Sequence, residues 1–166
     1  MADADFLKLA TELGAALKSR GWALALAESC TGGWAAQTVT EISGSSAWFD
    51  RGFVTYNNSA KIEMLGVQET TLQQHGAVSE PTVQEMALGA LTHSHAQISA
   101  AISGIAGPDG GTPQKPVGMV CFAWARPNGL LHSEIHYFSG DREAVRRQSV
   151  ETALRGAITL TLSTDL

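Results

Sequence analysis

Two short apolar runs, Trp22–Glu28 (WALALAE) and Ala96–Ser103 (AQISAAIS), constrain the fold of this chain more than any other feature. Neither run alternates apolar with polar residues along its whole length, which is typical of strands that are buried on both faces of a sheet. Helical periodicity surrounds them. In the segment before the first run, one face collects the apolar residues Phe6, Leu9, Ala10, Leu13 and Leu17. The pattern indicates a sheet covered by helices on both faces.

The remaining segments complete this picture. Further strands are predicted at 48–56, 117–125 and 130–138, with Arg126–Gly129 as the turn of a hairpin. Further helices are predicted at 31–42, 58–66, 69–75, 79–95 and 141–162. Asp3 or Asp5 is expected to cap the first helix, and Asn58 or Ser59 the helix that ends at Gly66. We therefore predict one α/β domain over residues 1–166, a three-layer α/β/α sandwich with a mixed sheet of about five strands.

Charge and cysteine content exclude several function classes. Charged residues make up 16% of the 166 residues, the net charge is −5, and Arg146–Arg147 is the longest basic run, so no nucleic-acid partner is expected. We see neither a signal peptide nor an apolar run long enough to span a membrane. With only Cys30 and Cys121, no disulfide framework is expected, and free thiols suit a reducing compartment. The sequence therefore predicts a cytoplasmic protein.

The stretch AESCTGGW, residues 27–34, lies where a predicted strand becomes a helix. Its glycines would let a ligand approach the backbone, and free N–H groups at such a junction can hold an anion or a developing oxyanion. Ser29 could then be a nucleophile, with Cys30 as the neighbouring alternative. Equally, Ser29 or Thr31 could do no more than cap the helix. The residues of the turn leave both interpretations open.

A serine nucleophile needs a base. Lys61 is predicted in the first turn of a helix, where the helix dipole and burial would both lower its pKa toward a neutral amine. Tyr56 ends the preceding strand and could relay a proton or orient a substrate. The alternative is a solvated lysine and a tyrosine at the edge of the core. The five histidines have no third ligand at a recognisable spacing, so no metal site is expected.

A third loop, SGIAGPDGG at Ser103–Gly111, is rich in glycine. It could present backbone N–H groups to a phosphate, with Lys115, Arg142 or Arg146 as countercharge, or be a plain connection. The carboxyl ends of parallel strands share one edge of a sheet, where ligands bind. Three loops, Glu28–Gly33, Tyr56–Ser59 and Ser103–Gly111, follow predicted strands. If these strands are parallel, the loops share that edge and could form one pocket.

Taken together, the motifs AESCTGG, GSSAWFDRGFVTYNNSAK, HGAVSE, SGIAGPDGG, KPVG and FSGDREAVR resemble the CinA C-terminal domain family over about residues 5–157. The stand-alone members of that family are nicotinamide-nucleotide amidases. The resemblance implies a three-layer sandwich that converts nicotinamide mononucleotide to nicotinate mononucleotide and ammonia with a Ser–Lys pair, without metal or cofactor. It also implies a homo-oligomer, commonly a dimer, and no pyrophosphatase-type activity, since the large N-terminal domain of full-length CinA proteins is not in this chain.

The same resemblance assigns the site residues. The nucleophile maps onto Ser29, its lysine onto Lys61 and its tyrosine onto Tyr56. The expected substrate-binding residues are Cys30, Thr31, Gly32, Gly33, Ser46, Ser103, Gly104, Ile105, Ala106, Gly107 and Arg142. Two other functions stay open at this point: a nucleotide-binding module that does not turn its ligand over, and an amidase for a different small amide. Release of ammonia from nicotinamide mononucleotide separates them.

Overall fold

A five-stranded mixed sheet runs through the middle of the protein, in the strand order β2-β1-β3-β4-β5. The structure is a computed structural model that describes residues 3–163. β1 (Leu24–Glu28) lies between β2 (Phe49–Val54) and β3 (Ile98–Gly104), and these three strands are parallel. β4 (Met119–Ala125) runs antiparallel to both β3 and β5 (Leu131–Tyr137). The predicted mixed sheet and the late hairpin are confirmed.

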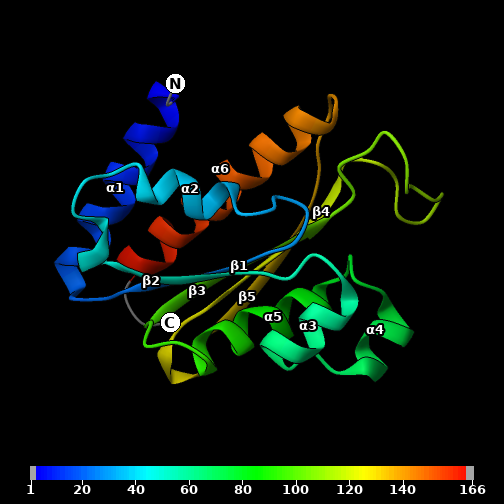
Figure 1. Cartoon of the computed structure of the whole chain (residues 1–166), viewed down its shortest axis with the longest axis horizontal. Helices are drawn as coiled ribbons and strands as arrows, with labels where there is room; N and C mark the ends of the chain where they lie inside the picture. Colours follow the sequence, from blue (N-terminus) through cyan, green and yellow to red (C-terminus); the bar gives the residue numbers. More distant parts are fainter. Residues whose placement is uncertain (1–2, 164–166) are drawn as a thin grey trace.

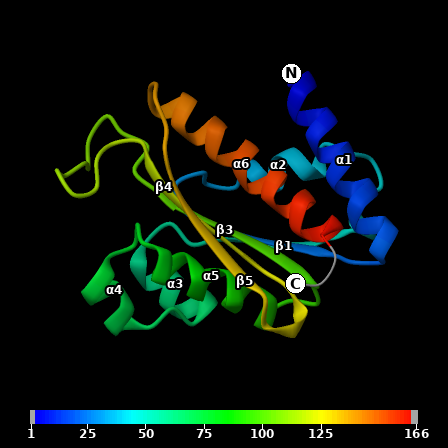
Figure 2. The ribbon, with the colours of Figure 1, turned by 180° about the vertical axis from the view of Figure 1, so that it is seen from behind.

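Helices cover both faces of this sheet (Figures 1 and 2). One face carries α1 (Ala4–Arg20), α2 (Trp34–Thr40) and α6 (Arg142–Leu162). The other carries α3 (Asn58–Leu65), α4 (Glu69–His75) and α5 (Glu80–Thr92). The three-layer α/β/α sandwich is therefore also confirmed.

The central strand β1 shows why the apolar runs fit this architecture. All five of its residues are buried. Because side chains alternate across a strand, Leu24 and Leu26 pack into the core below α1, α2 and α6, while Ala25 and Ala27 pack into the core on the α5 side. Strands buried on both faces need apolar residues at consecutive positions, and this produces the uninterrupted run in the sequence.

Helix caps agree with the prediction in part. Asp3, rather than Asp5, caps α1 by accepting hydrogen bonds from two backbone N–H groups, and Gly21 ends that helix in the left-handed conformation. The cap of α3 is Asn57, whose side chain accepts from the N–H of Asn58, so the prediction of Asn58 or Ser59 is wrong by one position or more. Gly66 ends α3 as predicted.

Several predicted elements are shorter in the structure. α2 begins at Trp34 instead of Thr31, because Gly32 (φ 61°) and Gly33 (φ 104°) are left-handed and cannot belong to the helix. The second predicted strand is trimmed at both ends to β2, and α5 ends at Thr92 instead of His95. Among the helices of residues 3–163, none is long and apolar enough to cross a membrane.

Candidate active site

Three loops meet at one edge of the sheet, as predicted from the parallel strands. β1 pairs with β2 and with β3 up to Glu28, which lies opposite Val54 and Ile102. The segments that follow these strands therefore leave the sheet side by side. They are residues 29–33, here the serine turn, residues 55–61, and residues 105–118, here the glycine loop.

The serine turn is tight, and some of its backbone groups already form hydrogen bonds within the protein. The Ser29 N–H donates to the carbonyl of Ile102 at 3.0 Å, and the Gly32 N–H donates back to the Ser29 carbonyl at 3.1 Å. Gly32 and Gly33 provide the positive φ angles that the reversal needs. Within the described part of the chain, the N–H groups of Thr31 and Gly33 donate to no acceptor. The turn therefore offers free donors next to the Ser29 hydroxyl.

Glu28, a residue that the sequence interpretation missed, joins this turn to α2. Its buried carboxylate accepts from the Thr31 hydroxyl at 2.6 Å and from the N–H groups of Ala35 and Ala36 at 2.9 Å each. Glu28 thus caps α2, and neither Ser29 nor Thr31 does, so the interpretation of the turn as a simple Ser/Thr cap is wrong. The available signal was a glutamate at the end of an apolar run, just before a glycine turn. A carboxylate buried at such a place needs several hydrogen-bond donors.

Lys61 faces Ser29 across the edge of the sheet. It lies on the first turn of α3, and its side chain is only 1% exposed. Its Nζ lies 3.0 Å from Ser29 Oγ, 2.8 Å from the Thr55 carbonyl oxygen and 3.2 Å from that of Tyr56. The alternative of a solvated surface lysine is therefore wrong.

The burial of Lys61 favours a neutral amine, which is the form that can act as a base. Burial lowers the pKa of Lys61 from its ordinary value, outweighing the effect of Cys30, which raises it. A neutral amine has two N–H groups and one lone pair. In the charged form, Nζ donates to Ser29 Oγ and to the two carbonyls. In the neutral form, the carbonyls of Thr55 and Tyr56 take the two N–H groups, because they can only accept, and the lone pair is available to the Ser29 hydroxyl.

Cys30 is poorly suited to be the nucleophile. Its side chain is buried, and burial raises the pKa of the thiol to about 11 in spite of the nearby Arg146 charge, which lowers it. Only the thiolate is a strong nucleophile, so this thiol is inert at neutral pH.

Tyr56 and Arg142 meet at the mouth of the site. The Tyr56 side chain is 61% exposed, and its hydroxyl accepts a hydrogen bond from Arg142 Nη2 at 3.2 Å, while Arg142 Nη1 donates to the Gly107 carbonyl at 2.8 Å. The part of Tyr56 that contacts Lys61 is its backbone carbonyl. Arg142 therefore ties the tyrosine to the glycine loop.

The glycine loop follows β3 directly, and Ser103 is buried at the end of that strand. A Cβ on Gly104 would lie 2.6 Å from Val120 Cγ2 and 3.0 Å from the Met119 carbonyl oxygen, so only glycine fits there. The Ile105 N–H donates to Met119. Within residues 3–163, no acceptor receives the N–H groups of Ala106 and Gly107. These two groups, at the start of the loop, are available to a ligand.

A cavity of about 460 Å³ opens between this loop and the start of α6, lined by Ala106, Pro108, Val117, Gly140, Asp141, Arg142 and Glu143. Of the other cations suggested for a phosphate, Lys115 Nζ donates to the His75 carbonyl oxygen. Arg146 binds carbonyl oxygens of the serine turn. Arg142 is thus the cation that lines the cavity.

Ser46 is the expected site residue that the structure does not bring to the others. It is exposed on a short 3₁₀ helix, Ser45–Ala47, that precedes β2. Because β2 is parallel to β1, this helix lies at the amino end of the strands, whereas Ser29 follows their carboxyl end. Within one chain the two serines lie at opposite edges of the sheet.

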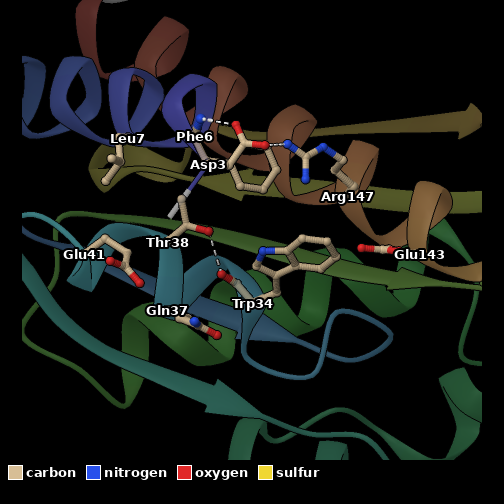
Figure 3. Close-up of a pocket in the computed structure, with 9 residues that line it drawn as sticks. All are labelled: Asp3, Phe6, Leu7, Trp34, Gln37, Thr38, Glu41, Glu143 and Arg147. Carbon is tan, nitrogen blue, oxygen red and sulfur yellow. Dashed lines mark hydrogen bonds and ion pairs between the residues drawn. The ribbon is translucent and has the colours of Figure 1, made fainter. Parts of the chain in front are cut away.

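Among the described residues, no group of three or more His, Cys, Asp or Glu side chains could hold a metal ion. A second cavity, of about 340 Å³, lies between α1, α2 and α6 (Figure 3). There Arg147 pairs with Asp3, next to Phe6 and Trp34. Its lining contains none of the residues expected in the site.

Comparisons with known proteins identify the family of the chain. Residues 7–161 match the family model of the CinA C-terminal domain. A nicotinamide-nucleotide amidohydrolase, PncC, from Escherichia coli strain K12 is 57% identical over 155 residues, which cover 93% of this chain and 94% of the relative. The protein of that name from Pseudomonas putida is 50% identical over 152 residues, covering 92% and 94%. Among solved structures, competence/damage inducible protein CihA from Agrobacterium tumefaciens has a TM-score of 0.93 and 45% identity, and covers 96% of this chain and 98% of its own.

Proposed function

The chain belongs to the CinA C-terminal domain family, and on that premise we propose that it hydrolyses the carboxamide of nicotinamide mononucleotide to nicotinate mononucleotide and ammonia. The relatives of high identity carry the name of this activity and cover almost the whole chain. The observation that carries the mechanism is the contact between Ser29 Oγ and the buried Nζ of Lys61.

The reaction begins at this pair. Ser29 Oγ attacks the amide carbon while its proton passes to the lone pair of Lys61. The amide oxygen becomes an oxyanion and is held by free N–H groups of the serine turn, Thr31 and Gly33 being available. One such donor typically contributes about 3–4 kcal/mol of barrier lowering.

The same lysine completes both halves of the reaction. Protonated Lys61 donates its proton to the leaving nitrogen, so the C–N bond breaks and ammonia departs. An acyl ester of Ser29 remains. Lys61, neutral again, removes a proton from water, which attacks the ester carbon and restores the serine hydroxyl. No further proton carrier is needed, because the Lys61 amine contacts the Ser29 hydroxyl directly.

The nucleotide part of the substrate is bound by Arg142, Tyr56 and the glycine loop. The free N–H groups of Ala106 and Gly107, with the Arg142 guanidinium, form the phosphate subsite. The Tyr56 hydroxyl, held by Arg142, orients the substrate rather than relaying the serine proton. The homodimer and the cytoplasmic location implied above stay predictions.

The test is to incubate the purified protein with nicotinamide mononucleotide and to measure ammonia together with nicotinate mononucleotide. Equal amounts of the two products support the proposal. Binding without product would instead identify a nucleotide-binding module. Release of ammonia from other small amides, but not from this nucleotide, would identify an amidase of different specificity.

A further inference from the structure

Arg146 holds the serine turn from outside the catalytic pair. Its Nε donates to the Cys30 carbonyl at 3.0 Å and its Nη2 to the Thr31 carbonyl at 3.2 Å. Two neighbouring peptide groups of the turn are thus fixed by one guanidinium. Such a forked contact depends on the planar shape of arginine and is not reproduced by lysine.

These contacts also determine where an N–H group points. In a trans peptide, the C=O and the following N–H lie on opposite sides of the same plane. With the Cys30 carbonyl directed at Arg146, the Thr31 N–H of that peptide points away from α6. The Thr31 carbonyl belongs to the next peptide, and the N–H of that peptide, on Gly32, already donates to the Ser29 carbonyl. Arg146 thus contacts two peptide groups, Cys30–Thr31 and Thr31–Gly32. Of these two, only the Cys30–Thr31 peptide has an N–H group without an acceptor.

Arg146 is itself held in place. Its guanidinium carbon lies 5.5 Å from the ring centre of Trp34, within range of a cation–π contact. It is four residues after Arg142, so both arginines project from one face of α6. Arg142 binds the glycine loop and Tyr56 while Arg146 binds the serine turn, so a single helix sets the spacing of the two loops.

We propose that Arg146 is a positioning residue that orients and polarises the Cys30–Thr31 peptide, so that the Thr31 N–H serves as an oxyanion donor. Arg146 acts through the backbone and does not touch the substrate. A cation on the carbonyl oxygen strengthens the N–H of the same peptide as a donor, as in other chains of hydrogen bonds. This inference rests on the amidase function proposed above, because it assigns the group that stabilises the oxyanion of that reaction.

The test compares Arg146→Gln and Arg146→Lys with the control Arg147→Gln. Arg147 is the next residue of α6, but it pairs with Asp3 and lies over the Phe6 ring, away from the turn (Figure 3). We expect Arg146→Gln to lower kcat by about 10²–10³-fold with KM changed by less than about threefold, as for loss of an oxyanion donor. Arg146→Lys should fall between the glutamine variant and the wild type, and Arg147→Gln should stay within about twofold of the wild type.

A second readout separates this inference from the proposed function. A fluorophosphonate probe reacts with an activated serine and needs the same oxyanion donors, whether or not nicotinamide mononucleotide is a substrate. We expect its rate with Ser29 to fall in Arg146→Gln and to be unchanged in Arg147→Gln. If the wild type reacts with the probe but not with the nucleotide, the proposed function fails and the probe rates still test Arg146.

Several results would overturn the role of Arg146. One is a raised KM with unchanged kcat, which would make Arg146 a substrate ligand. Another is an equal loss in Arg146→Gln and Arg147→Gln, which would reduce both to general support of α6. If Arg146→Gln does not fold, Arg146→Lys decides the matter, provided that its melting temperature matches that of Arg147→Gln: unchanged kcat and probe rate in this variant would contradict the inference.

Discussion

Lys61 Nζ lies 3.0 Å from Ser29 Oγ, although 32 residues separate the two in the chain. The sheet brings them together, because Ser29 follows β1 and Lys61 follows the parallel neighbour β2. Two backbone carbonyls take the N–H groups of the amine, so its remaining position faces the serine. The arrangement makes an uncharged lysine a base for this hydroxyl.

The first prediction concerns the pH dependence of activity. Burial lowers the pKa of Lys61, and only the neutral amine can accept the serine proton. Below that pKa, kcat/KM should rise about tenfold per pH unit and then level off at a pH below 10.5, the ordinary value for lysine. A steady-state pH series with nicotinamide mononucleotide measures this. Activity that falls as the pH rises would be incompatible with a lysine base.

The second prediction concerns stability. Because the pKa of Lys61 is lowered in the folded state, the unfolded chain binds this proton more tightly than the folded protein does. The contribution of Lys61 therefore increases the free energy of unfolding as the pH rises toward 10.5. The wild type should therefore gain stability relative to Lys61→Met as the pH increases. Chemical denaturation of both proteins at several pH values tests this. A stability difference that is independent of pH would show that the lysine titrates normally in the fold.

The third prediction concerns Glu28. Its carboxylate accepts three hydrogen bonds that join the serine turn to α2. Glu28→Gln replaces one acceptor oxygen by an NH₂ group that faces donors, so we expect a loss of about 2–4 kcal/mol in the free energy of unfolding. The matched control is Glu41→Gln at the exposed end of α2, with a change within about 0.5 kcal/mol. Equal effects in denaturant titrations would contradict the capping role.

The fourth prediction concerns the phosphate. Arg142 lines the cavity beside the glycine loop. Arg142→Ala should raise KM for nicotinamide mononucleotide by about 10–100-fold, the loss of one or two charge-assisted hydrogen bonds. Nicotinamide riboside, which has no phosphate, serves as the control substrate, and its kcat/KM should change much less. If both substrates lose equally, Arg142 acts only by holding Tyr56 and Gly107.

The sequence predicted the parts of the site that depend on local pattern. Ser29 and Lys61 each follow a predicted strand, and the parallel pairing of those two strands brings the two side chains together. The sequence does not reveal Glu28 as a helix cap, because Glu28 is the last residue of a strand, β1. Its role depends on the left-handed Gly32 and Gly33, which carry the chain past the carboxylate before α2 begins.

The sequence also did not predict contacts between residues that are far apart in the chain. The spacing of Arg142 and Arg146 shows that they share a helix face, but the carbonyls that receive Arg146 lie more than a hundred residues away in the chain. Similarly, the motif around Ser46 does not reveal that this serine lies at the opposite edge of the sheet from Ser29, because strand order and direction are tertiary features.

The most direct test of the nucleophile is a comparison of Ser29→Ala with Cys30→Ala, both verified as folded by circular dichroism. The measurement is ammonia released from nicotinamide mononucleotide at saturating substrate. We predict that Ser29→Ala loses at least about 10³-fold in kcat, as expected for removal of a nucleophile. Cys30→Ala should keep most of its activity, because the buried thiol of Cys30 stays protonated. Retained activity in Ser29→Ala, with loss in Cys30→Ala, would contradict the Ser–Lys mechanism.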